Sequence, residues 1–151
     1  MTDREIVARQ IGRTPRAFRA VAVRCPFGRP AVTEQAPFDE NGNPFPTQYW
    51  ITCSHLAAAI ARVEAGGGVE RWTRAVHDEP DLERSRDDAN AKQRELRPEL
   101  PSGVGGSLSG GSLKCLHAHA AFALAQPGYA LGDRILAELP SLWPTSCCTD
   151  L

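Results

Sequence analysis

The chain has 151 residues and a net charge of −1, and 42% of its residues are hydrophobic and 23% charged. These values are ordinary for one globular domain, so they exclude wholesale disorder and a uniformly basic nucleic-acid-binding surface. No apolar run reaches the roughly 18–20 residues that a membrane-spanning helix needs. The charged start, MTDREIVARQ, lacks the apolar core of a signal peptide and predicts a cytoplasmic protein. In that compartment five Cys are expected to serve as thiols or metal ligands.

The first third of the sequence predicts one helix and a small antiparallel sheet. A helix is expected over residues 3–11, capped by Thr2 or Asp3 and ended by Gly12. Three later segments have the composition or the alternating pattern of strands: residues 20–25, 30–35 and 48–53. The first two are expected to form a hairpin, and Asn41-Gly42 marks a turn before the third.

After Cys53 the pattern changes to helix, with apolar residues at helical spacing and Ser54 as an expected N-cap. The expected helical segments are residues 55–65, 69–77, 80–96, 113–125 and 132–139. A loop rich in Gly and Ser separates the third and fourth of these. The sequence therefore predicts an α+β fold, with a small antiparallel sheet in the first third packed by four or five helices. We find no repeat or composition break, so we expect a single domain over residues 1–151 with a tail from residue 140.

Three thiols and an imidazole form a candidate zinc site. Cys25 and Cys53 each end a predicted strand, so they would lie close together at one end of the sheet if those strands are neighbours. Cys115 begins the segment Lys-Cys-Leu-His-Ala-His and adds either His117 or His119. Zinc prefers four thiolate or imidazole ligands in a tetrahedron. The alternative is that these Cys are simply small buried residues.

The choice between the two His depends on where the helix begins. On a continuous helix, Cys115 and His119 share a face, whereas His117 lies nearer the apolar stripe. If Cys115 still lies in the first turn, Cys115 and His117 can converge instead. An iron–sulfur cluster is the closest rival to zinc, with Cys147 or Cys148 in place of the His.

The same segment also offers a candidate anion-binding site. Gly110, Gly111 and Lys114 precede a predicted helix N-terminus, where free N–H groups favour a phosphate or carboxylate. The spacing is not that of a Walker loop, and a capped surface loop is the plainer interpretation. An enzyme acting on an anionic or phosphorylated small molecule would then use Cys115 as nucleophile and His117 in acid–base chemistry.

A third hypothesis is a non-catalytic interaction protein that uses an Arg-rich surface. Residues 6–33 contain six Arg and no acid: Arg9, Arg13, Arg16, Arg19, Arg24 and Arg29. Such a surface can bind an acidic protein partner or nucleic acid, although nucleic acid is disfavoured by the net charge. The plainer interpretation pairs these Arg within the fold with the acids of residues 78–99.

Four sequence pieces occur together in a recognisable order. They are Val-Ala-Arg-Gln-Ile-Gly-Arg (7–13), Arg-Cys-Pro-Phe-Gly (24–28), Asn-Pro-Phe-Pro-Thr-Gln-Tyr-Trp-Ile-Thr-Cys (43–53) and Gly-Gly-Ser-Leu-Lys-Cys-Leu-His (110–117). This set resembles the DUF501 family, small bacterial proteins found mainly in actinobacteria. The resemblance covers residues 6–139, and no function is assigned to the family. It implies a bacterial cytoplasmic protein whose gene often lies near those for enolase, a septum-formation protein and an exopolyphosphatase.

The resemblance also bears on the candidate site. It implies that the thiol and imidazole positions of the family correspond to Cys25, Cys53, Cys115 and His117. It therefore favours His117 over His119. The leading hypothesis from the sequence is a small zinc-binding protein with these four ligands.

Overall fold

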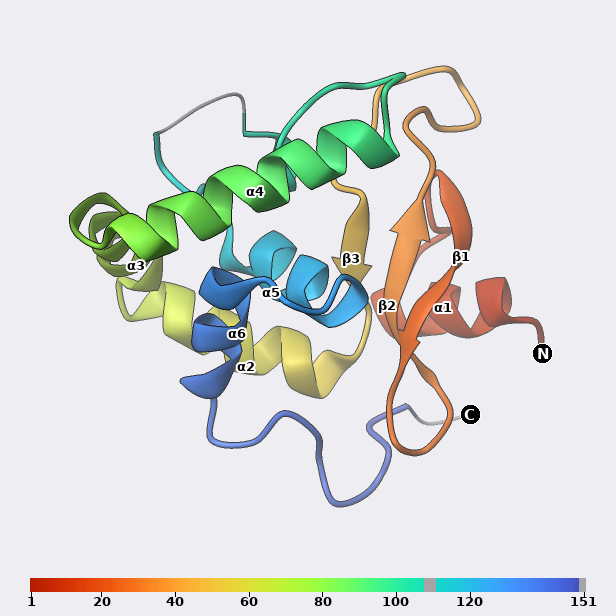
Figure 1. Cartoon of the computed structure of the whole chain (residues 1–151). Helices are drawn as coiled ribbons and strands as arrows, with labels where there is room; N and C mark the ends of the chain where they lie inside the picture. Colours follow the sequence, from red (N-terminus) through yellow and green to blue (C-terminus); the bar gives the residue numbers. More distant parts are fainter. Residues whose placement is uncertain (108–110, 150–151) are drawn as a thin grey trace.

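The computed structural model describes residues 1–107 and 111–149, which contain one antiparallel sheet of three strands (Figure 1). The strands are β1 (Phe18–Arg24), β2 (Pro30–Gln35) and β3 (Tyr49–Ile51). They lie in chain order, so β2 is central and pairs with both neighbours. This confirms the small early sheet that the alternating segments predicted.

Six α-helices and one 3-10 turn complete the described part of the chain. They are α1 (Asp3–Ile11), α2 (Ser54–Ala65), α3 (Gly68–Asp78), α4 (Pro80–Leu96), the 3-10 turn η1 (Val104–Gly106), α5 (Leu116–Ala125) and α6 (Ala130–Ala137). The α+β class is therefore confirmed. In Figure 1 the sheet lies to one side, and α2, α4 and α6 surround α5.

Helices α3 and α6 begin one and two residues earlier than expected, and the starts of α2 and α5 differ from the expected ones for reasons that the backbone shows. Ser54 is the first residue of α2 rather than its cap, because the extended Cys53 is the N-cap. Helix α5 begins at Leu116 instead of residue 113, because Lys114 has a φ of +66° and Cys115 is extended. A left-handed residue cannot continue a right-handed helix. Cys115 therefore lies just before the first turn of α5.

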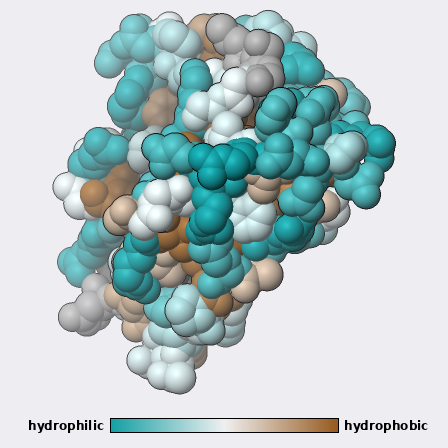
Figure 2. All heavy atoms as spheres, turned by 90° about the vertical axis from the view of Figure 1, so that its left-hand side faces the viewer, coloured by the Kyte–Doolittle hydropathy of each residue, from teal (hydrophilic) through white to brown (hydrophobic). Residues whose placement is uncertain are grey.

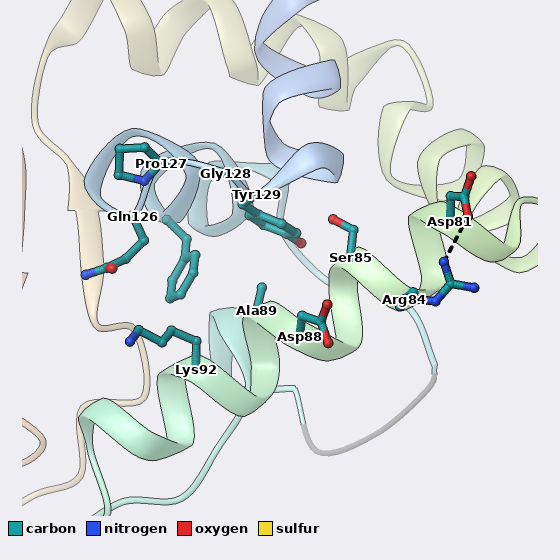
Figure 3. A pocket seen from close by; sticks show the side chains of 11 residues that line it. Asp81, Arg84, Ser85, Asp88, Ala89, Lys92, Gln126, Pro127, Gly128 and Tyr129 are labelled. Atoms are coloured by element: carbon teal, nitrogen blue, oxygen red, sulfur yellow. Dashed lines mark hydrogen bonds and ion pairs between the residues drawn. The ribbon is translucent and has the colours of Figure 1, made fainter.

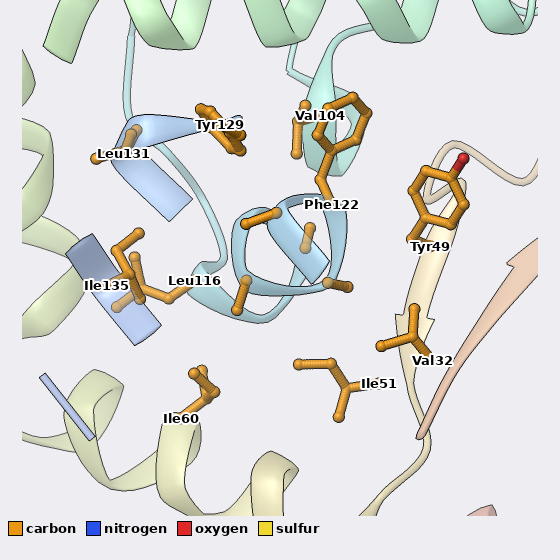
Figure 4. Packing of buried hydrophobic residues seen from close by; sticks show 14 of the residues in the cluster. Val32, Tyr49, Ile51, Ile60, Val104, Leu116, Phe122, Tyr129, Leu131 and Ile135 are labelled. Carbon is orange, nitrogen blue, oxygen red and sulfur yellow. The ribbon is translucent and has the colours of Figure 1, made fainter. Parts of the chain in front are cut away.

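The core is organised around α5, which is buried on almost all sides. Its buried residues are Leu116, Ala118, His119, Ala120, Ala121, Phe122 and Ala123. Figure 4 looks along this helix, with Tyr49 and Ile51 of β3 on one side, Ile135 of α6 on the other, and Ile60 of α2 below. A helix that is apolar all round is typical of a fully enclosed position.

The face of the molecule that carries α3 and the start of α4 is mostly hydrophilic. Figure 2 shows this face, where polar side chains cover most of the area and apolar ones are scattered. Such scattered apolar residues are normal on a protein surface. None of the helices in the described residues is both long enough and apolar enough to cross a membrane.

A buried arginine ties the end of α4 to the connection between β2 and β3. Arg97 is 1% exposed, and its guanidinium donates hydrogen bonds of 2.7–3.0 Å to the carbonyl oxygens of Ala36, Phe45 and Pro46. Buried carbonyl groups need such donors because they cannot bind water. One side chain thus satisfies three backbone groups of a segment that has little regular structure of its own.

Replacing Arg97 with Met should lower the free energy of unfolding by roughly 3 kcal/mol or more, because each buried carbonyl left without a donor costs about 1–3 kcal/mol. Urea unfolding followed by circular dichroism measures this loss. Arg94→Met is the matched control, because Arg94 is exposed on the same helix, and should cost less than about 0.5 kcal/mol. Equal losses in the two variants would contradict the structural role of Arg97.

Candidate metal centre

The start of α5 brings a thiol next to a carboxylate from α2. Cys115 is the N-cap of α5, but its side chain makes no capping hydrogen bond. Glu64 supplies the cap instead, because its Oε2 accepts a hydrogen bond of 2.7 Å from the Leu116 N–H. The helix dipole also favours a negative group at this position. The Cys115 thiol is therefore not needed to start the helix.

His117 completes a compact group of three side chains. Its Nδ1 lies 3.2 Å from Glu64 Oε1, and its Nε2 lies 3.1 Å from the carbonyl oxygen of Ala57. Glu64, Cys115 and His117 each offer one ligand atom, and these three atoms all lie within 4.8 Å of one another. Because the Ala57 carbonyl can only accept a hydrogen bond, Nε2 carries a proton, and Nδ1 is the nitrogen that faces the carboxylate.

The surroundings of His117 favour its protonated form when no metal is bound. The adjacent Cys115 side chain has the largest effect on the pKa and raises it, partial burial lowers it, and the Glu64 carboxylate raises it further. The result is a pKa of about 9 for His117. Two neighbouring groups thus attract positive charge at this point, and a metal cation would meet the same attraction.

Cys115 and His117 line a pocket of about 390 Å³ between β3 and α5. The rest of its lining is mostly apolar or aromatic: Thr47, Tyr49, Trp50, Ile51, Ala57, Gly105 and Ala118. Glu64 contacts His117 but is not part of the lining of this pocket. The shape and lining suit a small molecule with an apolar or aromatic group.

The structure brings together only two of the four zinc ligands expected from the sequence. Cys115 and His117 are neighbours, but Cys25 and Cys53 lie outside their group. Cys25 follows β1 and Cys53 follows β3, and the central strand β2 lies between these two strands. Two strand spacings separate the strand ends by about 10 Å. Both thiols are buried, as in the plainer interpretation.

Cys148 lies beside Cys53 at the start of α2, and neither thiol belongs to the group of Cys115 and His117. The Cys148 sulfur is 3.5 Å from the Cys53 sulfur, and Cys147 is half-buried. An iron–sulfur cluster stays a prediction.

His119 has a structural environment. It is 1% exposed, its Nδ1 lies 2.7 Å from the Tyr129 hydroxyl, and its Nε2 lies 3.2 Å from the Leu113 carbonyl oxygen. Burial lowers the pKa of His119 to about 4, so the ring is neutral. Both nitrogens are occupied within the core, which leaves none for a metal.

Of the three expected anion-binding residues, the two that the structure describes do not line a pocket with the Cys115 thiol. Gly110 lies outside the described residues. Gly111 lines a separate hollow with residues of α3 and α4, and Lys114 is exposed in its left-handed conformation. Neither lines the pocket of Cys115 and His117, which offers no Lys or Arg for a phosphate.

The Arg-rich segment pairs with acids other than those expected. Arg24 binds Asp3 and Arg16 binds Asp39, while Arg13 lies over the ring of Trp50. In the described part of the chain, no ion pair joins residues 6–33 to the acids of residues 78–99, so that interpretation is wrong. A contact surface for a protein partner stays a prediction.

Another hollow lies between α4 and the turn that joins α5 to α6 (Figure 3). Most of its polar groups already have partners. The Tyr129 hydroxyl binds His119, the Ser85 hydroxyl accepts a hydrogen bond from the Leu131 N–H, and Arg84 pairs with Asp81. This hollow therefore lacks the convergent free groups of a binding site.

Cys115→Ser should lower the pKa of His117 from about 9 toward the ordinary value of about 6.5, because the side chain with the largest effect is removed. Glu64→Gln should lower it as well. An NMR titration of the metal-free protein measures both shifts. An unchanged His117 titration in both variants would contradict this arrangement.

The same titration affects stability. Because folding raises the pKa of His117, the protonated ring stabilises the fold fully below about pH 6.5, and this contribution is lost as the pH rises through about 9. Urea unfolding of the metal-free protein should therefore show a larger effect of Glu64→Gln at pH 6 than at pH 9.5. An effect that grew with pH would contradict the sign.

A comparison with curated proteins and a comparison with solved structures each gave no match. The family model described as "Protein of unknown function (DUF501)" matches residues 21–103, which is more than half of the chain. The matched region contains most of the sheet, α2, α3, α4 and Glu64, and it ends before Cys115 and His117. On this match, the chain belongs to the DUF501 family.

Proposed function

We propose that this protein binds one zinc ion through Glu64 Oε1, Cys115 Sγ and His117 Nδ1. The observation that carries the proposal is the convergence of these three ligand atoms within 4.8 Å. Zinc binds N, O and S atoms at about 2.0–2.3 Å, so a tetrahedral site places ligand atoms roughly 3.3–3.7 Å apart. The 3.2 Å between His117 Nδ1 and Glu64 Oε1 is already close to that spacing.

The groups behind the ligands support the same assignment. A metal-binding imidazole usually donates its other N–H to a carbonyl or carboxylate, which fixes the ring. The Ala57 carbonyl does this for His117, and the Leu116 N–H holds the second oxygen of Glu64. Two of the three ligands are therefore oriented before any metal arrives. Glu64 replaces the two sheet thiols that the sequence suggested.

Three protein ligands leave the fourth tetrahedral position for water or a substrate, which is typical of catalytic rather than structural zinc sites. Cys115 and His117 line the pocket, so a molecule held there would lie next to two of the three ligand side chains. Bound zinc would lower the pKa of such a water and polarise a carbonyl group. The substrate that suits the apolar lining is a small molecule with an apolar or aromatic group beside the reacting bond.

Protein purified without chelator should contain about one zinc per chain by elemental analysis, and Glu64→Gln, Cys115→Ser and His117→Gln should each lose most of it. Affinity should rise with pH until His117 has lost its proton, at a pKa of about 9. The cobalt(II) form should show a thiolate-to-metal absorption band that Cys115→Ser removes.

Cys25→Ser and Cys53→Ser are the controls, because they test the ligands suggested by the sequence. Both should keep the zinc content and the cobalt band. If these two variants lost the metal while Glu64→Gln kept it, the ligand set proposed here would be wrong. A folded wild-type protein that binds no zinc at pH 8 would contradict the function itself.

The metal-free arrangement favours a second candidate function, nucleophilic chemistry by Cys115. Its thiol lines the pocket with an imidazole beside it, and a carboxylate contacts that imidazole. Alkylation with iodoacetamide distinguishes the candidates. Under the zinc proposal, zinc should protect Cys115 and chelator should expose it. A rate that zinc does not change would favour the thiol as a nucleophile.

A further inference from the structure

We infer that Cys53 and Cys148 form a redox-active dithiol that exchanges with anionic low-molecular-weight disulfides. Their sulfur atoms are 3.5 Å apart, although the residues are 95 positions apart in sequence. Cys53 is buried and Cys148 is exposed, so one thiol faces solvent and the other lies behind it. A disulfide has a sulfur–sulfur length of about 2.05 Å, so closure needs an approach of about 1.5 Å.

The C-terminal segment holds Cys148 at this place by contacts on both sides. After α6 the chain returns below α2 toward α1 (Figure 1). His55 Nε2 lies 3.4 Å from the Ser141 carbonyl oxygen, and Gln10 donates a hydrogen bond of 2.9 Å to the Thr149 hydroxyl. The segment is therefore attached before and after Cys148. The approach of the two thiols does not depend on a loose chain end.

The two thiols have opposite chemical environments. Partial burial acts to raise the pKa of Cys148, but hydrogen bonds from the Ser54 side chain, the His55 N–H, Cys53 and the Ser54 N–H outweigh it and lower the pKa to about 7. Burial raises the pKa of Cys53 to about 11. The thiolate is the attacking form of Cys, so Cys148 suits the first attack and Cys53 suits the second.

A polar hollow of about 230 Å³ adjoins Cys148 and defines the class of substrate. Its other lining residues are Arg9, Gln10, Ser54 and Thr149, which offer one positive charge and no acid. A neutral disulfide would gain nothing from the Arg9 guanidinium. A disulfide that carries carboxylates, such as glutathione disulfide, would gain an ion pair with Arg9 beside the attacking sulfur.

The reaction proceeds by two thiol–disulfide exchanges. The Cys148 thiolate attacks one sulfur of the substrate disulfide, forms a mixed disulfide and releases one thiolate. Cys53 loses its proton to solvent and attacks the Cys148 sulfur, which forms the Cys53–Cys148 disulfide and releases the second thiolate. One substrate disulfide is reduced to two thiols, and the protein dithiol is oxidised to a disulfide. The reverse sequence returns the protein to its reduced form.

Glutathione disulfide, added to the reduced full-length protein in the presence of chelator, provides the test. Wild-type protein should lose two hydrogens in mass, and peptide mapping should place the new disulfide between Cys53 and Cys148. Cys53→Ser should stop at a single glutathione adduct on Cys148. Cys148→Ser should form neither product. Cys147→Ser is the matched control, because it changes the adjacent thiol, and it should react like wild type.

The mapping of wild-type protein needs no variant, so a folding defect in Cys53→Ser cannot hide the result. A disulfide that involves Cys25, Cys115 or Cys147 instead, or no disulfide at all, would overturn the proposal. Arg9→Gln should remove the rate advantage of glutathione disulfide over the neutral hydroxyethyl disulfide. If that advantage persisted, the preference for anionic substrates would be wrong. Loss of zinc in Glu64→Gln changes none of these outcomes.

Discussion

The enclosure of α5 is the constraint on which the rest of this structure depends. A helix in the centre of a core cannot expose the N–H groups of its first turn to water, so another part of the protein must accept their hydrogen bonds. Glu64 provides one such acceptor for Leu116, from a position 52 residues earlier in the chain. This contact joins the end of α2 to the start of α5. It also places the Glu64 carboxylate beside the His117 ring. The same side chain therefore takes part in the packing of the core and in the candidate site.

Helix α4 has a related role for the irregular segments. Its buried side chains include Asn90 and Gln93, which are polar, and Arg97 follows directly after its end. Gln93 donates hydrogen bonds to the Ser102 and Gly103 carbonyls, while Arg97 donates to carbonyl groups in the connection between β2 and β3. These segments obtain from side chains the hydrogen bonds that sheets and helices obtain from their own backbone. These hydrogen bonds explain why α4 has few buried apolar residues. Part of its inner face binds loops instead of packing against the apolar core.

Local signals in the sequence predicted most of the fold. Thr2 and Gly12 bound α1 as expected, and α4 has the predicted limits because Pro80 suits a first turn. The site was predictable only in part. Cys115 and His117 are close in sequence, so the start of the helix decides whether they converge. Glu64 could not be assigned, since its partner is far away in the chain, although it is the one acid in residues 41–69. The position of β2 between β1 and β3 is a matter of topology, and no local pattern indicated that it separates Cys25 from Cys53.

The pocket beside Cys115 is lined mainly by residues of α5 and β3, which pack in the core, with single residues from other segments. One of these is Gly105, which belongs to η1, whose first N–H donates to the Asn90 side chain. Gly105 has a φ of +69°, and a Cβ there would lie 3.2 Å from the Ala118 Cβ, so the backbone approaches α5 as closely as a side-chain-free residue permits. The pocket therefore owes part of its width to the missing side chain at residue 105, and a substitution there would strain η1 without replacing Cys115 or His117.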